Sequence, residues 1–491
     1  MRARSALSLF SASLMMASGL LMACGNGDDN SSGVPPVPDA SMSGGDGGHG
    51  ADAGDAGATT PADGGGADGA AATSLQHVYV IMMENHAYLQ ILGDGGAAVA
   101  PNLNLYAQNY SLATQYYGVT HPSLPNYLAA ISGDFQGVWD DCNAGPTVTC
   151  QPEEFTSTSG DGTDTDLMSP AQFANASTIP HWFSGQTIVD QLEAKGLTWT
   201  AYMGAIPGEG DVSAANPPSI LDFALGDDGG FVQQFAQVDT TDDAGNDAGF
   251  VNGAPLTTAG NLYAQKHNPF EYFSNIRGNT HRMQKIVPFS NFATDITGTT
   301  MPNYVWISPD QCQDIHSVNS STGAWLDSGT VDAGPLGPIC SSTAAGNDMS
   351  GELISYGDAF VGDTVNKIMS SPTWNDGSAI VIIFDEDDYK QTQGCCNSPT
   401  SDDGGVLGGA QVPAIVISSL LVNTPVTSND PYNHYSMLAT LQHIWGLGCL
   451  ANTCGMSGDQ LMTSLFLPSA DAGSAPTDAG SPSDGATTGD N

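Results

Sequence analysis

The sequence predicts an α/β fold, specifically a three-layer α/β/α sandwich with a largely parallel central sheet. Several short and continuously apolar segments are typical of strands that are buried on both faces. Segments with helical periodicity separate these strands along the chain. Alternation of the two kinds of segment favours a single sheet with helices packed on both faces.

The expected elements follow from local composition. Each expected strand is an apolar run that stops at polar residues, and the helix that ends before Gly196 has an amphipathic pattern with a glycine stop. The expected strands are residues 76–83, 197–203, 303–308, 379–384 and 412–418. The expected helices are residues 101–110, 126–131, 187–195, 351–370 and 434–445.

The N-terminal segment is expected to direct export rather than to fold. Arg2 and Arg4 precede an apolar run rich in small residues, so we predict a signal peptide over residues 1–23. This segment ends in Leu-Met-Ala-Cys24, which resembles a bacterial lipobox. We therefore expect a lipid on Cys24 as the only membrane attachment, with an ordinary secreted protein as the alternative.

Two low-complexity segments flank the expected domain. Residues 24–73 consist mainly of Gly, Ala, Asp, Ser and Pro, and residues 467–491 have the same composition. Such segments lack the large apolar side chains that a core needs, so we predict a disordered stalk and a disordered tail. The folded domain is then residues 74–466, which we expect to be monomeric.

The charge balance restricts the partners. The chain has 52 Asp and Glu against nine Lys and Arg, and its formal net charge is −43. This balance disfavours nucleic acid as a partner. It would also repel an anionic substrate, so chemistry on a phosphate needs a local cation: a metal ion, a protonated histidine, or one of the few basic side chains.

The cysteines agree with export. Apart from Cys24 there are eight, and an even number in an exported chain indicates disulfides. The absence of any Cys-x-x-Cys pair disfavours the competing interpretation, a zinc site. The expected pairs are Cys142–Cys150 and Cys449–Cys454, which are close in sequence, and then Cys312–Cys340 and a vicinal or crossed arrangement at Cys395 and Cys396.

Polar residues gather after the expected strands. In open parallel sheets ligands bind beyond the carboxyl ends of the strands. Several carboxylates at one edge of a sheet would repel each other unless a cation lay among them, and a divalent metal ion is the simplest such cation. The residues concerned are Glu84, Asn85, Asp310, Asp314, His316, Asp385 and Glu386.

A proline-rich turn precedes the expected helix at residues 126–131. Pro122 and Pro125 restrict the backbone and indicate a rigid turn that presents Thr120 or Ser123. A helix N-terminus offers free N–H groups and the positive end of a dipole. The hydroxyl is therefore either a nucleophile for an anionic group such as phosphate or a plain helix cap.

Seven motifs in order resemble a known family: Met83-Glu-Asn85, Thr120-His-Pro-Ser-Leu-Pro-Asn-Tyr127, residues 187–202, Lys266-His-Asn-Pro-Phe270, Pro309-Asp-Gln-Cys-Gln-Asp-Ile-His316, Phe384-Asp-Glu386 and His434-Tyr-Ser436. They resemble the bacterial phosphoesterase family of secreted acid phosphatases and phospholipase C enzymes, within the alkaline phosphatase-like superfamily. The similarity is greatest to the acid phosphatase branch, which includes phosphatidylinositol-3-phosphatase-like proteins. It implies an alkaline phosphatase-like fold and a phosphoric monoester hydrolase acting outside the cytoplasm. A phospholipase C-type phosphodiesterase is the alternative.

The resemblance also implies roles for single residues. The segment from Ser123 to Gly133 is similar in spacing to the nucleophile segment of nucleotide pyrophosphatases. This spacing implies that Ser123 forms a phosphoserine intermediate and that Asn126 binds a phosphoryl oxygen. Thr120 is the alternative nucleophile.

The same resemblance implies a divalent metal site and its surroundings. Oxygen ligands where the two-zinc relatives have histidine favour Mg, Ca or Mn, with Zn or Fe still possible. The implied ligands are Glu84, Asn85, Ser123, Asp385 and Glu386. The implied residues for phosphate binding, proton transfer or a second metal are Asp314, His316 and His434, and His267 is expected to stabilise charge near the leaving group.

Overall fold

The computed structural model describes most of the predicted domain. The described residues are 74–93, 96–152, 168–206, 250–251, 254–255, 263–316, 318–319, 341–342, 351–388, 391–402, 404–422 and 424–468. The predicted signal peptide, Cys24, the stalk and the tail beyond residue 468 lie outside them. No helix among the described residues is both long enough and apolar enough to cross a lipid bilayer.

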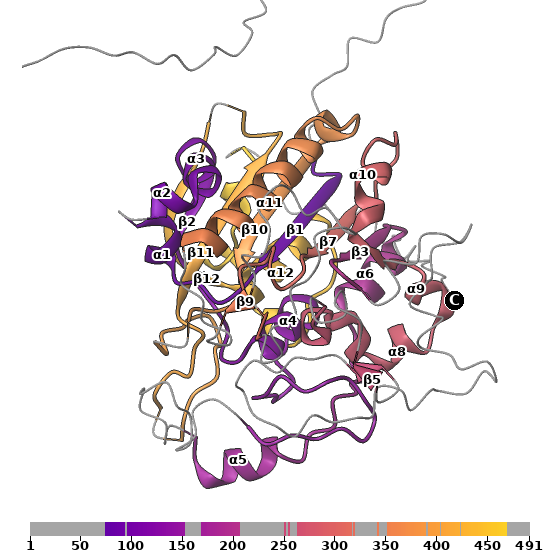
Figure 1. Ribbon diagram of the computed structural model, residues 1–491, viewed down its shortest axis with the longest axis vertical. Helices are drawn as coiled ribbons and strands as arrows, with labels where there is room; N and C mark the ends of the chain where they lie inside the picture. The colour runs from indigo at the N-terminus through magenta and orange to yellow at the C-terminus, as the bar shows by residue number, and fades with distance from the viewer. Residues whose placement is uncertain are drawn as a thin grey trace, which may run out of the picture. The chain divides into compact units, whose positions relative to one another are not determined.

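An eight-stranded sheet forms the centre of the domain (Figure 1). Its strand order is β12-β2-β11-β10-β1-β7-β3-β6, and β11 is the single strand antiparallel to its neighbours within this sheet. The strands are β1 (His77–Met83), β2 (Ser111–Tyr117), β3 (Trp199–Met203), β6 (Ile286–Pro288), β7 (Tyr304–Ser308), β10 (Ser378–Phe384), β11 (Gln411–Ser418) and β12 (Thr427–Asn433). Two short pairs are separate: β4 (Phe250–Val251) with β5 (Ala254–Pro255), and β8 (Val318–Asn319) with β9 (Ser341–Ser342).

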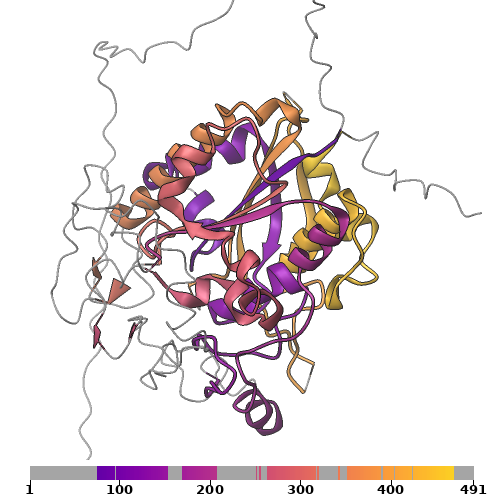
Figure 2. The same ribbon diagram turned by 90° about the vertical axis from the view of Figure 1, so that its right-hand side faces the viewer.

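Helices cover both faces of the sheet (Figure 2). One group consists of α1 (Tyr88–Leu92), α2 (Gly96–Val99), α3 (Pro101–Asn109) and α11 (Gly351–Met369), which pack on one another, and α1 and α3 contact β11. A second group consists of α4 (Ser123–Ser132), α6 (Ile188–Lys195) and α12 (His434–Ile444), in which α4 contacts both of the others. The predicted three-layer α/β/α fold with a largely parallel sheet is therefore confirmed.

The remaining helices are shorter. The α-helices are α5 (Pro170–Ala176), α8 (Ser274–Arg277), α9 (Thr280–Met283), α10 (Phe292–Asp295) and α13 (Thr463–Phe466). The 3₁₀ helices are η3 (Gln265–His267), η4 (Pro269–Tyr272), η5 (Phe289–Asn291), η6 (Trp374–Asp376), η7 (Ala451–Thr453) and η8 (Gly458–Gln460). Of these, η3 carries the Lys-His part of the Lys-His-Asn-Pro-Phe motif.

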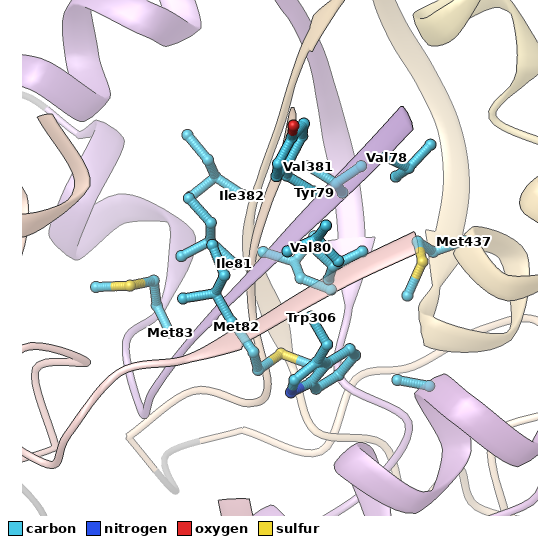
Figure 3. Close-up of a cluster of buried hydrophobic side chains, with 14 of the residues drawn as sticks. Val78, Tyr79, Val80, Ile81, Met82, Met83, Trp306, Val381, Ile382 and Met437 are labelled. Carbon is cyan, nitrogen blue, oxygen red and sulfur yellow. The ribbon is translucent and has the colours of Figure 1, made fainter. Parts of the chain in front are cut away.

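The core lies on both faces of the central strands. All residues of β10 are buried, and those of β1 are buried from Val78 onward, as expected for inner strands of a covered sheet. Side chains alternate between the faces, so Val80 points towards Met437 of α12 while Ile81 points to the opposite face (Figure 3). This packing holds the carboxyl ends of β1 and β10 in fixed positions beside each other.

All ten expected elements are present, and three strands of the main sheet were missed. The missed strand β2 alternates buried and partly exposed positions, so it lacks the continuous apolar run used to find the others. The prediction that the helix after the proline-rich turn starts near Asn126 is wrong, because α4 begins at Ser123. Pro125 fits in its first turn, where a backbone N–H has no partner within the helix.

Three of the expected disulfides are confirmed: Cys142–Cys150, Cys449–Cys454 and the vicinal pair Cys395–Cys396. Cys340, the expected partner of Cys312, lies outside the described residues.

Candidate active site

Ser123 lies at the first position of α4 and is completely buried. Its Oγ lies 3.0 Å from Oε2 of Glu84 and 3.0 Å from Oε1 of Glu386. A hydroxyl has one proton and can donate to only one of these carboxylates. The second close approach between oxygens therefore needs a further proton or a cation.

Glu84 follows β1, and its other oxygen faces a different group of residues. Tyr127 of α4 donates a hydrogen bond from its hydroxyl to Oε1 of Glu84. The Tyr127 ring stacks on His267, with centroids 5.2 Å apart, and His267 Nε2 lies 3.3 Å from the same oxygen. Each oxygen of this carboxylate therefore has a defined environment.

Asp314 completes a second cluster with His267. Its Oδ2 lies 3.2 Å from His267 Nδ1, and its Oδ1 accepts a hydrogen bond from the backbone N–H of His316. The Glu84 backbone N–H donates to the Asp314 carbonyl over 2.9 Å. Ligand atoms of Glu84, His267 and Asp314 lie within 4.8 Å of one another, so these three buried residues could hold a metal ion.

Asp385 and Glu386 follow β10, directly beside the end of β1. Oδ1 of Asp385 accepts hydrogen bonds from the backbone N–H groups of Asn85, at 3.0 Å, and of Glu386, at 2.7 Å. Asn85 is buried with a φ of 50°, a left-handed conformation that asparagine adopts more readily than most residues. The two strand ends are therefore fixed to each other.

Burial makes the charged forms of these carboxyl groups unfavourable. It raises the pKa of Glu84 and of Asp314 well above their ordinary values, and neighbouring carboxylates raise both further. Burial raises the pKa of Asp385 to about 6 and that of Glu386 to about 8. Carboxylate, amide and hydroxyl oxygens that converge in this way fit a divalent cation that prefers oxygen ligands.

Asn126 and His434 lie beside this group but bind protein atoms. The Asn126 side chain accepts hydrogen bonds from the N–H groups of Val119 and Thr120 and donates to the carbonyls of Thr120 and Pro122, so it braces the turn before Ser123. His434 contacts the carbonyl of Asp385. The pKa of His434 is lowered to about 4 by burial, so its ring is neutral.

The two hydroxyls of the turn differ in their surroundings. Ser123 lies between two carboxylates, whereas Oγ1 of Thr120 is buried with no hydrogen-bond partner in the described part of the chain. His316 was predicted at the site, and its Nε2 lies 3.4 Å from Nζ of Lys266. The structure therefore places Ser123, Thr120 and His316 in one region, where each side chain has different surroundings.

Four residues of this region were not predicted. Tyr127 lies one helical turn after Ser123, and His121 contacts Oε2 of Glu386 through Nδ1, so their closeness in sequence to Ser123 was a usable signal. Asp141 accepts hydrogen bonds from the Leu124 N–H at 2.9 Å and from Lys266 Nζ at 2.8 Å. Nothing local indicates this bridge, because Asp141 and Lys266 are 125 positions apart.

The fold and the site together define an α/β protein in which a buried serine at a helix N-terminus lies between carboxylates at adjacent strand ends. The family model described as Phosphoesterase family matches residues 95–333 and 339–448. This match covers more than half of the chain, so the chain belongs to the Phosphoesterase family. The resemblance found in the motifs is thereby confirmed.

Several proteins of known description are similar to this chain. An acid phosphatase of Aspergillus fumigatus is 24% identical over 360 residues, which cover 73% of this chain and 54% of the relative. A phosphatidylinositol-3-phosphatase of Mycobacterium tuberculosis is 21% identical over 382 residues, which cover 78% of this chain and 81% of the relative. A protein of the alkaline phosphatase superfamily from Vibrio parahaemolyticus has 15% identity and a TM-score of 0.35, over 79% of this chain and 72% of that one. The chain thus spans about half the length of the fungal relative.

Proposed function

We propose that the protein is a metal-dependent phosphoric monoester hydrolase of the acid phosphatase type, with Ser123 as the nucleophile. The observation that carries this proposal is the position of Ser123 Oγ, 3.0 Å from a carboxylate oxygen of both Glu84 and Glu386. A buried hydroxyl between two carboxylates is suited to losing its proton beside a cation. The family and the names of its relatives support phosphate esters as the substrate class.

The proposed ligands of a divalent metal ion are Glu84, Asn85, Ser123, Asp385 and Glu386. Mg, Ca or Mn suits this oxygen-rich set best. When bound, such an ion would lower the pKa of the serine hydroxyl and neutralise charge on the phosphoryl oxygens.

The proposed reaction has two halves. Ser123 gives up its proton to a neighbouring carboxylate, and its Oγ forms a bond to phosphorus while the bond from phosphorus to the ester oxygen breaks. The leaving oxygen takes up a proton, which balances the one that Ser123 has released, and departs as the alcohol. Water then attacks the phosphoserine and the Oγ–P bond breaks. The proton that the water loses restores the serine hydroxyl, and phosphate is released.

The residues near Oε1 of Glu84, the oxygen that does not contact Ser123, are suited to interact with the leaving group. Burial lowers the pKa of His267 well below its ordinary value, and the neighbouring Lys266 and His316 lower it further, which favours the neutral ring. A neutral imidazole between Glu84 and Asp314 can donate a hydrogen bond to an incoming ester oxygen. Together with His316, it is our candidate for stabilising the departing alkoxide.

The proposed place of action is outside the cytoplasm. Three disulfides among the described residues are consistent with an oxidising compartment. The apolar N-terminal segment and Cys24 support export, with a lipid anchor as the finer proposal.

Substitution of the nucleophile tests the proposal directly. We expect Ser123→Ala to lower turnover of 4-nitrophenyl phosphate by about 10³-fold or more, since removal of a nucleophile typically has effects of this size. Thr120→Ala, three positions before Ser123, is the matched control and should retain most activity. Near-wild-type turnover in the Ser123 variant would disprove the assignment, and faster cleavage of 4-nitrophenylphosphocholine than of the monoester would favour the phosphodiesterase alternative.

A further inference from the structure

His434 is the first residue of α12, is completely buried and has both ring nitrogens engaged. Its Nε2 lies 2.7 Å from the backbone carbonyl oxygen of Asp385, and its Nδ1 lies 3.0 Å from the hydroxyl of Tyr116. A carbonyl oxygen can only accept, so Nε2 carries the proton and donates. Nδ1 is then the acceptor and Tyr116 donates to it.

Local structure explains why this imidazole is held so firmly. Asn433 caps α12 by accepting hydrogen bonds from the N–H groups of Tyr435 and Ser436. Tyr116 lies on β2 opposite Tyr432 of β12, and its ring meets the His434 ring edge-on with centroids 5.5 Å apart. The sheet and the helix cap therefore fix the orientation of the His434 ring that contacts Asp385.

The Asp385 carbonyl lies at a crowded point of the backbone. A Cβ on Gly118 would lie 2.6 Å from this oxygen. The backbone at Gly118, which precedes the turn that carries Ser123, therefore packs directly against the Asp385 carbonyl. The Asp385 N–H donates to the Met83 carbonyl, and the Asp387 N–H donates to the Gly409 carbonyl. The peptide that joins Asp385 to Glu386 is thus held by His434 on its carbonyl side.

These contacts leave His434 no free polar atom for the substrate. Both nitrogens are occupied by protein groups, whereas phosphate binding, proton transfer or metal ligation would each need one of them. A histidine that orients a ligand-bearing segment through a hydrogen bond acts on the metal indirectly.

We propose that His434, with Tyr116, is a positioning residue that aligns Asp385 and Glu386 for metal binding. This inference depends on the proposed function only in taking these two carboxylates as metal ligands. It assigns His434 a role different from the phosphate binding, proton transfer or second metal site implied by the family resemblance.

Three variants separate this role from the alternatives. His434→Gln can place an amide N–H near the position of Nε2 and so keep the donor to the Asp385 carbonyl. His434→Asn places its amide near the position of Nδ1 and loses that donor. Tyr116→Phe removes only the hydroxyl that donates to Nδ1.

The primary measurement is the Kd for Mn²⁺ of the metal-free protein, obtained by titration calorimetry. We expect His434→Asn to raise the Kd by about 10- to 100-fold, the range typical of residues that orient metal ligands. His434→Gln should recover much of the affinity, and Tyr116→Phe should fall between them. At saturating Mn²⁺, kcat of the Gln variant should approach that of the wild type.

The outcomes have distinct meanings. Equal Mn²⁺ affinity in the wild type and the Asn variant would overturn the positioning role, even if the melting temperature falls. Loss of kcat in both the Asn and Gln variants at saturating Mn²⁺ would instead indicate proton transfer or phosphate binding, and would also overturn it. Retained turnover in Ser123→Ala would disprove the proposed function separately, because that variant does not alter His434.

Discussion

Removal of the divalent metal should destabilise the protein more as the pH rises. Burial raises the pKa of Glu386 from its ordinary 4.5 to about 8 in the folded protein. A folded-state pKa above the unfolded value means that the folded protein holds this proton more tightly. The contribution of Glu386 to the stability of the metal-free protein should therefore be fully present below about pH 4.5, and it should be lost as the pH rises towards 8.

The size of this effect follows from the shift. Each unit of pKa difference corresponds to about 1.36 kcal/mol, so the full shift of Glu386 is worth about 5 kcal/mol. Between pH 5 and pH 8 the metal-free protein should lose about 3.5 kcal/mol of its free energy of unfolding from this residue alone. A bound cation favours the ionised carboxylate, so the metal-loaded protein should lose much less over this range.

Urea unfolding at several pH values tests this expectation. The metal is removed with a chelator followed by dialysis, and the free energy of unfolding is measured with and without Mn²⁺ from pH 5 to pH 8. Glu386→Gln is the matched control, because it removes one titrating carboxyl and should make the loss of stability of the metal-free protein smaller by about this amount. A metal-free wild type whose stability is constant or rises over this range would refute the reasoning.

Three further substitutions have defined outcomes. Asp358→Ala removes the acceptor of the Asn102 and Leu103 N–H groups at the start of α3 and should lower the free energy of unfolding by about 1–3 kcal/mol in urea titrations. Asp363→Ala should have little effect, because Asp363 is exposed and its ion pair with Lys367 lies at the surface. Tyr127→Phe removes a donor to Glu84 and should weaken Mn²⁺ binding about 10-fold by calorimetry. Gly118→Ala should reduce both the melting temperature and Mn²⁺ affinity, because its methyl group would meet the Asp385 carbonyl.

The central part of the fold could be predicted because burial on both faces leaves a simple pattern. The strands β1 and β10 are continuous apolar runs, and the residues that follow them had to lie side by side once the two strands were parallel neighbours. That is why Glu84, Asp385 and Glu386 could be placed together from sequence. The strand β2 was not predicted because buried residues along it are separated by partly or fully exposed ones, so it has no continuous apolar run.

Contacts between distant residues could not be predicted in this way. The pair Tyr116 and His434 is 318 positions apart, and it depends on β2 and β12 being neighbours, which neither segment indicates by its own composition. Asn126 shows a different limit. Its position in the motif implied that it binds phosphate, whereas its side-chain amide binds the backbone of the turn before Ser123. The sequence alone does not show which groups an amide side chain will hydrogen-bond.

The structure also narrows the source of positive charge in this acidic protein. Three sources were open: a metal ion, a protonated histidine or a basic side chain. Burial lowers the pKa of His267 and of His434, which favours the neutral form of both rings. Lys266 is paired with Asp141 at 2.8 Å, so its charge is largely compensated before a substrate arrives. These three side chains therefore offer little positive charge to four buried carboxylates and an incoming phosphate, and a divalent cation is the source of charge that the site favours.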